Sequence, residues 1–238
     1  MAQLDVVFVP TPSLNLNGRT GVVIDVLRAT TTIITALGSG CPEVLPVDTP
    51  EEAIDLARNF DRDSHLIGGE RKGLKVGGFD LGNSPGEYTS SALNGRKVIL
   101  CTTNGTHVIR RSAQAKPLYL AAFLNASSVA EALIGEDAHA TLVCSGCEDT
   151  FALEDALCAG LIAKEVLGSR GWVGTDGANA AVALWKAYER RDLANSLKET
   201  DHGSYLASIG FADDVSAAAE TDKYSLIPVC REGKIIPL

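Results

Sequence analysis

The sequence predicts an α/β protein with three layers, α/β/α, around a mostly parallel sheet. Short apolar runs rich in β-branched residues alternate along the chain with amphipathic segments of helical periodicity. Buried strands that alternate with helices form parallel crossover units, whose helices cover both faces of the sheet. With 238 residues, of which 45% are hydrophobic, the chain can bury the core of one compact domain over residues 1–238.

Eight apolar runs are predicted to be strands, and five amphipathic segments are predicted to be helices. The second helix has the clearest start, because Thr49 suits the N-cap, Pro50 the first helical position and Glu52 the capping-box position. The predicted strands are Leu4–Val9, Thr20–Val26, Glu43–Val47, His65–Gly68, Lys97–Thr102, Leu118–Ala121, Thr141–Cys144 and Leu226–Val229. The predicted helices are Thr30–Leu37, Pro50–Asn59, Ser127–Ile134, Phe151–Leu167 and Ala178–Arg190.

One order of elements occurs twice. A strand, a loop rich in hydroxyl groups, a helix, a strand and a capped helix follow one another over residues 20–60 and again over residues 96–135. Either a duplication or the ordinary recurrence of such units in α/β chains explains this pattern. A duplication would give two similar lobes, intertwined within one domain because no flexible linker separates them.

Charge and composition exclude several classes of function. Lys and Arg number 21 against 30 Asp and Glu, which gives a formal net charge of −9. Such a protein is a poor binder of polyanions, so we expect no nucleic-acid partner. Because no basic leader and no apolar stretch of about 18 residues is visible, we expect a cytoplasmic protein without a membrane segment. The six cysteines are typical of buried reduced thiols, and the Cys144-x-x-Cys147 pair alone is a weak metal or redox signal.

Chemically active side chains are expected where strands end, because open parallel sheets bind ligands beyond the carboxyl ends of their strands. The second predicted strand carries Asp25 at its end and is followed by Arg28 and by threonines that include Thr30 and Thr31. Free N–H groups at a helix start, hydroxyl groups and a bidentate guanidinium suit a phosphate or a sulfonate. Asp25 would then bind a metal or act as nucleophile or base. Alternatively, Thr30 only caps the helix and Asp25 pairs with Arg28.

A glycine-rich region over residues 68–86 is a second candidate. Glycines allow a backbone to approach a ligand closely, and this region also carries both signs of charge. Its candidate side chains are Glu70, Arg71, Asp80, Asn83 and Ser84. We interpret the region as an active-site loop; a surface loop with solvated charges is the alternative.

Two further strand ends and one later segment complete the candidates. Thr102, Thr103, Asn104, Gly105 and Thr106 directly follow a strand, and their hydroxyl and N–H groups suit an oxyanion. Ser145 lies just after another strand, and Glu154 and Asp155 open the long helix that follows. These acids are either metal ligands or residues favoured by the helix dipole alone. His202, after a polar helix, is a candidate proton donor or phosphate contact.

Taken together, these segments resemble the 2-phosphosulfolactate phosphatase family, known from coenzyme M biosynthesis. The matching stretches are Asp25-Val-Leu-Arg-Ala-Thr-Thr-Thr, Gly69-Glu-Arg, Gly78-Phe-Asp-Leu-Gly-Asn-Ser-Pro, Thr102-Thr-Asn-Gly-Thr, Cys144-Ser-Gly, Leu153-Glu-Asp with Cys158-Ala-Gly, and His202-Gly. They follow in order over roughly residues 20–230, which is far more specific than one motif. The resemblance implies an α/β/α fold, a homodimer and a Mg²⁺-dependent phosphatase acting on a small phosphorylated sulfonate or a related 2-hydroxy-acid phosphate. It also implies that the motif residues line one site.

These residues and the resemblance predict metal-assisted hydrolysis of a phosphate monoester. Mg²⁺ held by carboxylates from Asp25, Glu70 and Asp155 would stabilise charge on the phosphate oxygens, and an activated water would attack in line. Arg28 and Arg71 would clamp the anionic groups of the substrate, and the loop over residues 102–106 would supply neutral donors.

A covalent aspartyl-phosphate on Asp25 is the variant mechanism. We rank it lower because Leu27 stands where haloacid-dehalogenase phosphatases have a second Asp. Two other functions remain open at this stage. One is a binding module for phosphorylated or sulfonated metabolites without turnover. The other is a thiol enzyme that uses Cys101 or Cys144.

Overall fold

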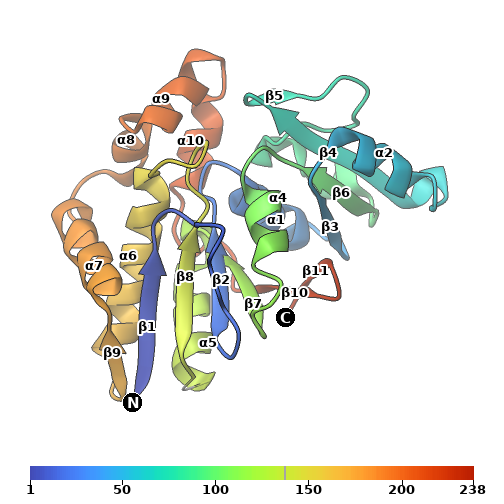
Figure 1. Cartoon of the computed structure of the whole chain (residues 1–238). Coiled ribbons are helices and arrows are strands. Elements are labelled where there is room, and N and C mark those ends of the chain that lie inside the picture. The colour runs from blue at the N-terminus through green and yellow to red at the C-terminus, as the bar shows by residue number, and fades with distance from the viewer. Residues whose placement is uncertain (137) are drawn as a thin grey trace.

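One mixed sheet of eleven strands, with ten α-helices around it, is formed by residues 1–136 and 138–238, the residues that the computed structural model describes (Figure 1). The strands are β1 (Ala2–Val7), β2 (Thr20–Ile24), β3 (Val44–Val47), β4 (His65–Arg71), β5 (Leu74–Lys75), β6 (Lys97–Cys101), β7 (Leu118–Ala121), β8 (Ala140–Cys144), β9 (Trp172–Gly174), β10 (Pro228–Arg231) and β11 (Lys234–Pro237). The predicted α/β class with a mostly parallel sheet is confirmed.

The helices differ greatly in length. They are α1 (Ala29–Gly38), α2 (Pro50–Ala57), α3 (Ser90–Leu93), α4 (Gly105–Arg111), α5 (Ala126–Glu136), α6 (Leu153–Gly168), α7 (Asp176–Tyr188), α8 (Leu193–Lys198), α9 (Asp201–Ser208) and α10 (Ala212–Ala218). Short 3₁₀ helices cover Arg62–Ser64, Pro85–Glu87 and Phe123–Asn125. All five predicted helices form, with ends shifted by a few residues. Thr49 caps α2 as predicted, because its Oγ1 accepts a hydrogen bond of 3.1 Å from the N–H of Glu52.

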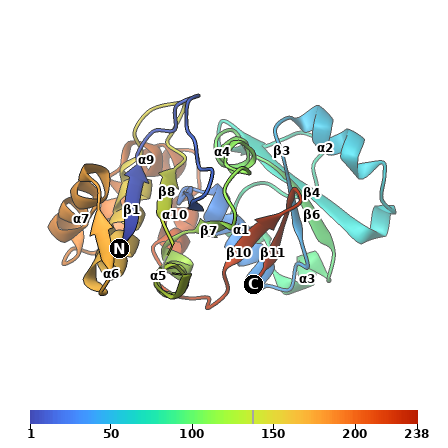
Figure 2. The same ribbon diagram turned by 60° about the horizontal axis from the view of Figure 1, so that its bottom comes forward.

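Two groups of parallel strands make up most of the sheet. One group has the order β7-β2-β8-β1-β9 and the other has the order β3-β6-β4. The antiparallel hairpin β10–β11 lies between them, where β10 pairs with β7 and β11 pairs with β3 (Figure 2). The C-terminal hairpin therefore joins the two groups into one sheet.

The strand order is symmetric about this hairpin. The succession β2, α1, β3, α2, β4 corresponds to the later succession β6, α4, β7, α5, β8. From the hairpin outward, one side reads β11-β3-β6-β4 and the other reads β10-β7-β2-β8. Because β3 lies beside β6 while β7 lies beside β2, the chain crosses between the groups in each succession. The two similar lobes are thus intertwined.

Separate apolar cores cover the two faces of the first group of strands. β2 is buried along its whole length, as expected of a central strand in a parallel sheet. Val22 and Ile24 face a core that includes residues of α5, α6 and α7, whereas Val23 faces a core built with α1 and α4. Helices on both faces give the predicted three layers.

The region after α7 differs most from the sequence-based expectation. The short helices α8, α9 and α10 lie beyond the carboxyl ends of β2 and β8, where they form a cap (Figure 1). Only one polar helix was expected there, because these helices have six to eight residues and weak apolar periodicity. Within residues 1–136 and 138–238, no helix is long and apolar enough to cross a lipid bilayer.

Candidate functional site

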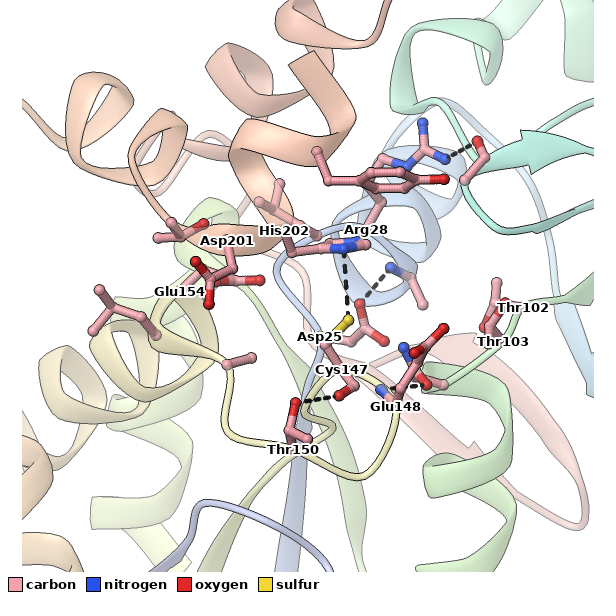
Figure 3. Close-up of a pocket in the computed structure, with 18 of the residues that line it drawn as sticks. Asp25, Arg28, Thr102, Thr103, Cys147, Glu148, Thr150, Glu154, Asp201 and His202 are labelled. Atoms are coloured by element: carbon pink, nitrogen blue, oxygen red, sulfur yellow. Dashed lines mark hydrogen bonds between the residues drawn. The ribbon is translucent and has the colours of Figure 1, made fainter. Parts of the chain in front are cut away.

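A pocket of about 650 Å³ lies where the ends of β2, β4, β6 and β8 meet the cap of short helices (Figure 3). This size suits a small-molecule ligand. Eight predicted site residues line it: Asp25, Arg28, Glu70, Asn83, Thr102, Thr103, Asn104 and His202. The rule that ligands bind beyond the carboxyl ends of parallel strands therefore located the pocket correctly.

Asp25 lies at the centre of the pocket, directly after β2. Its carboxyl group is buried, and its Oδ1 accepts a hydrogen bond of 2.9 Å from the N–H of Ala29, the first residue of α1. Burial, helped by the neighbouring carboxylates of Glu70 and Glu154 and opposed by the Ala29 hydrogen bond, raises the pKa of Asp25 to about 7. A carboxyl group in this setting is suited to bind a cation or to exchange a proton near neutral pH.

Gly105 allows the start of α4 to lie close to Asp25. A Cβ atom at Gly105 would lie 2.5 Å from Oδ2 of Asp25 and 2.4 Å from Cβ of Ala29. Any side chain at this position would separate the starts of α1 and α4. The predicted Gly105 therefore contributes by close approach, behind the residues that line the pocket.

Glu70, at the end of β4, connects two loops of the pocket. Its Oε1 accepts a hydrogen bond of 2.7 Å from the N–H of Thr103, and its Oε2 accepts one of 2.8 Å from the N–H of Gly73. The N–H of Thr103, in the loop that was predicted to bind an anion, is therefore bonded to Glu70.

Arg28 is partnered within the protein. Its Nη1 lies 2.6 Å from Oδ2 of Asp214 in α10, its Nη2 donates to the carbonyl of Gly73 at 2.6 Å, and its guanidinium stacks on Phe211. The side chains of this ion pair are only 2% and 7% exposed. Ser84, another predicted contact, donates to Oδ1 of Asp214 at 2.6 Å. The alternative pairing of Arg28 with Asp25 is thus replaced by a pairing with Asp214.

The loop after β6 supplies hydroxyl and amide groups. Thr102, Thr103 and Asn104 line the pocket, whereas Thr106 lies beneath them. The N–H of Thr102 donates to Oγ1 of Thr106, and the N–H of Thr106 donates to Oγ1 of Thr102, both at 3.1 Å. This reciprocal pair closes the loop over the start of α4.

Three predicted residues from other loops lie outside the pocket lining. Arg71 donates to the carbonyl of Asp48 at 2.8 Å and contacts the Cys101 thiol, so its guanidinium is used on the outer side of β4. Asp155 accepts hydrogen bonds from the N–H groups of Val26 at 2.8 Å and Gly146 at 3.1 Å. It therefore holds the backbone beside Asp25, which differs from the predicted role of metal ligand. Ser145 is buried, and its hydroxyl oxygen has no hydrogen-bond partner within the described residues.

Thr30 and Thr31 also lie behind the pocket, in the first turn of α1. Oγ1 of Thr30 accepts from the N–H of Asp25 at 3.0 Å and lies within hydrogen-bond distance of the Asp25 and Ala121 carbonyls. Oγ1 of Thr31 donates to the carbonyl of Val26 at 2.7 Å. Both hydroxyl groups form hydrogen bonds with backbone groups, and these bonds hold the loop that carries Asp25 in place.

His202 and Cys147 face each other across the pocket. Nδ1 of His202 lies 3.6 Å from Sγ of Cys147 (Figure 3). Burial, followed by the charge of Arg28, lowers the pKa of His202, so the imidazole is neutral at pH 7. Burial also raises the pKa of Cys147 to about 11, which keeps its thiol protonated. The thiols that sequence analysis singled out, Cys101 and Cys144, do not line the pocket.

Other lining residues lie inside predicted segments without having been chosen as site residues: Leu27, Ala29, Lys72, Gly73, Cys147, Leu153, Glu154 and Asp201. Glu154 was a candidate beside Asp155, and it is Glu154 whose carboxyl group reaches the pocket. No signal in the sequence pointed to the remaining lining residues, which are Glu148, Thr150, Phe151, Ala152, Glu199, Thr200 and Tyr205.

Negative charge dominates the pocket. Within the described residues, six acids line it, namely Asp25, Glu70, Glu148, Glu154, Glu199 and Asp201, against the two cations Arg28 and Lys72. In Figure 3, Asp25 lies between Glu154 and Asp201 on one side and Thr102 and Thr103 on the other. No group of three or more Asp, Glu, His or Cys side chains in residues 1–136 and 138–238 is arranged to hold a metal ion. Any metal here would therefore need oxygens from a substrate or from water.

Comparisons with known proteins agree over almost the whole chain. A family model described as 2-phosphosulpholactate phosphatase matches residues 9–233. A protein named "Probable 2-phosphosulfolactate phosphatase" from Pseudothermotoga lettingae is 44% identical, and the alignment covers 98% of this chain and 98% of that protein. Relatives with the same name from Symbiobacterium thermophilum and Thermotoga maritima are 42% and 40% identical, over 95% and 98% of this chain and 97% of each relative.

Proposed function

The chain belongs to the 2-phosphosulfolactate phosphatase family, and we propose that it is a phosphoric monoester hydrolase that converts 2-phosphosulfolactate into sulfolactate and phosphate. One observation carries the proposal: relatives that bear this name align with almost the whole chain. The pocket agrees with it, because the motif residues Asp25, Glu70 and Thr102 all line it.

Mg²⁺ is the cofactor that we propose for this reaction. Asp25 and Glu70 fit it, because both carboxylates are buried in the pocket lining and the pKa of Asp25 is raised by burial and by neighbouring carboxylates. Asn83 fits as well, because its buried Oδ1 lines the pocket region without a hydrogen-bond partner among the described residues. Asp155 does not fit, because its carboxylate lies outside the pocket lining, where it accepts the N–H groups of Val26 and Gly146. When bound, Mg²⁺ would supply positive charge against the phosphate oxygens; one or two carboxylates with substrate oxygens are a usual set for this ion.

The side chains of the pocket divide the remaining tasks. The side chains of Thr103 and Asn104 offer neutral donors to the phosphate oxygens, and Asp25 orients the attacking water. The water oxygen attacks phosphorus, the Asp25 carboxylate takes up the proton that the water loses, and the bond from phosphorus to the C2 oxygen breaks. Burial raises the pKa of Glu154, so its carboxyl group can hold the proton that the departing C2 oxygen takes up.

Phosphate release tests the proposal directly. After dialysis against a chelator, we expect the protein to release phosphate from 2-phosphosulfolactate only when Mg²⁺ is restored. Turnover that persists in excess chelator would contradict the Mg²⁺ requirement. Binding of 2-phosphosulfolactate without turnover, with or without metal, would instead favour a binding module.

Borohydride trapping during turnover separates the two chemical routes. We expect Asp25 to stay unmodified, because the water attacks phosphorus directly and no acyl phosphate forms. Reduction of Asp25 to homoserine in a borohydride quench would show that a covalent aspartyl-phosphate forms. The expected homodimer and cytoplasmic location stay predictions; light scattering on the purified protein measures the first.

A further inference from the structure

The pocket has little positive charge to offer a substrate with several anionic groups. Of its two cations, Arg28 forms a buried ion pair with Asp214 at 2.6 Å. Lys72 forms no ion pair within residues 1–136 and 138–238 and is exposed to solvent at the pocket wall. Lys72 is therefore the lining cation whose charge no neighbouring carboxylate offsets.

Lys72 and Gly73 form the two-residue turn between β4 and β5, where Arg71 pairs with Leu74. Lys72 has a φ of 51° and Gly73 a φ of 75°, and positive φ at both residues is what a tight hairpin turn of this length requires. The hairpin therefore fixes where Lys72 lies at the edge of the pocket.

Three hydrogen bonds fix this turn to the rest of the site. The hydroxyl of Tyr205 donates to the carbonyl of Lys72 at 3.0 Å. Arg28 donates to the carbonyl of Gly73 at 2.6 Å, and the N–H of Gly73 donates to Oε2 of Glu70 at 2.8 Å. The Arg28–Asp214 pair and Glu70 therefore position the Lys72 turn between α9 and the carboxylates of the pocket.

We propose that Lys72 binds the second anionic group of the substrate, the sulfonate or carboxylate that accompanies the phosphate ester. This inference rests on the proposed function. An ammonium is a point charge on a flexible stem, which suits an anion whose position relative to the phosphate varies among substrates. Acidic side chains repel such a group elsewhere in the pocket, so the cation decides which phosphate esters bind productively.

The test is the substitution Lys72→Gln, with Lys75→Gln as the matched control. Lys75 lies three residues further, in β5, is also exposed and does not line the pocket. We compare three substrates: 2-phosphosulfolactate, 2-phospholactate, which lacks the sulfonate, and ethyl phosphate, which lacks both acid groups. For Lys72→Gln we expect KM for 2-phosphosulfolactate to rise about tenfold, with kcat within about twofold and KM for ethyl phosphate unchanged.

The 2-phospholactate arm identifies the group that is bound. An unchanged KM there assigns Lys72 to the sulfonate, and a tenfold rise assigns it to the carboxylate. Lys72→Arg should restore KM. An equal rise in KM for ethyl phosphate, an equal effect of Lys75→Gln, or no effect on any substrate would overturn the proposal.

Calorimetric titration with sulfolactate separates this proposal from the proposed function. Sulfolactate carries both acid groups and no phosphate, so its binding requires no turnover. We expect Lys72→Gln to weaken it about tenfold while Lys75→Gln leaves it unchanged. A wild-type protein that binds sulfolactate through Lys72 but releases no phosphate would refute the phosphatase and retain the role of Lys72. Equal affinities of all three proteins would refute that role even in an active phosphatase.

Discussion

The turn after β2 and the turn after β6 occupy matching places in the sheet but carry different chemistry. In both turns a threonine hydroxyl in the following helix accepts the first N–H of the loop: Thr30 accepts from Asp25, and Thr106 accepts from Thr102. In both, the side chain of that first residue accepts an N–H at the helix start, at 2.9 Å for Asp25 and 3.1 Å for Thr102. The same pair of hydrogen bonds thus positions a carboxylate in one lobe and a hydroxyl group in the other.

This difference teaches how two similar lobes form an asymmetric site. The carboxylate of Asp25 lies near Glu70 and Glu154, a setting that favours a cation. The hydroxyl of Thr102 lies beside Thr103 and Asn104, which offer neutral donors to an anion. Each prediction below removes one side of this comparison and leaves the other in place.

The largest effect is expected from Asp25→Asn. The amide keeps the shape and can still accept the Ala29 hydrogen bond, but it has no negative charge for a cation or for the attacking water. We expect kcat/KM to fall roughly 10³-fold with an unchanged circular dichroism spectrum. Thr102→Ser, which keeps the hydroxyl of the matching position, is the control and should retain activity within a few-fold. A well-folded Asp25→Asn protein with wild-type turnover would show that the two turns do not differ in function.

The second prediction concerns stability in the metal-free protein. The pKa of Asp25 rises from its ordinary value of 3.8 to about 7 on folding, so the folded state binds the proton more tightly. The stabilisation is complete below pH 3.8 and is lost as the pH rises toward 7. Between pH 4 and pH 6 we expect wild type to lose roughly 2.5 kcal/mol relative to Asp25→Asn. Urea unfolding in chelator measures this, and parallel pH profiles for the two proteins would contradict it.

The third prediction tests whether both turns depend on the threonine hydroxyl that accepts the first N–H of the loop. Thr30→Val and Thr106→Val each leave a buried backbone N–H without its acceptor, at Asp25 and Thr102 respectively. We expect each change to lower the free energy of unfolding by about 2 kcal/mol in urea titrations. Thr30→Val should also lower kcat, because it loosens the loop that carries Asp25. A stability loss in only one variant would mean that the resemblance of the turns is superficial.

Patterns along the chain predicted the positions of both turns but not their partners. Asp25 and Thr102 were predicted because each follows a buried strand, and local periodicity fixes where strands end. The partner of Arg28 could not be predicted, because Asp214 is 186 residues away and belongs to a cap helix of seven residues. Exchanging Asp155 for Glu154 was a similar error, since neighbours in a first helical turn point in different directions.

The smallest effect is expected from Cys147→Ser, and it decides whether a third kind of group belongs in the comparison. Cys147 is the cysteine that lines the pocket in the described residues, and it lies 3.6 Å from Nδ1 of His202, the arrangement of a thiol nucleophile with its base. However, burial raises the pKa of Cys147 to about 11 and lowers that of His202, so neither the thiolate nor the imidazolium is populated at pH 7. We therefore expect kcat within about twofold of wild type, as for the control Cys101→Ser outside the pocket. A loss of 10²-fold or more in Cys147→Ser alone would place a thiol beside the carboxylate and hydroxyl turns as a participant in the chemistry.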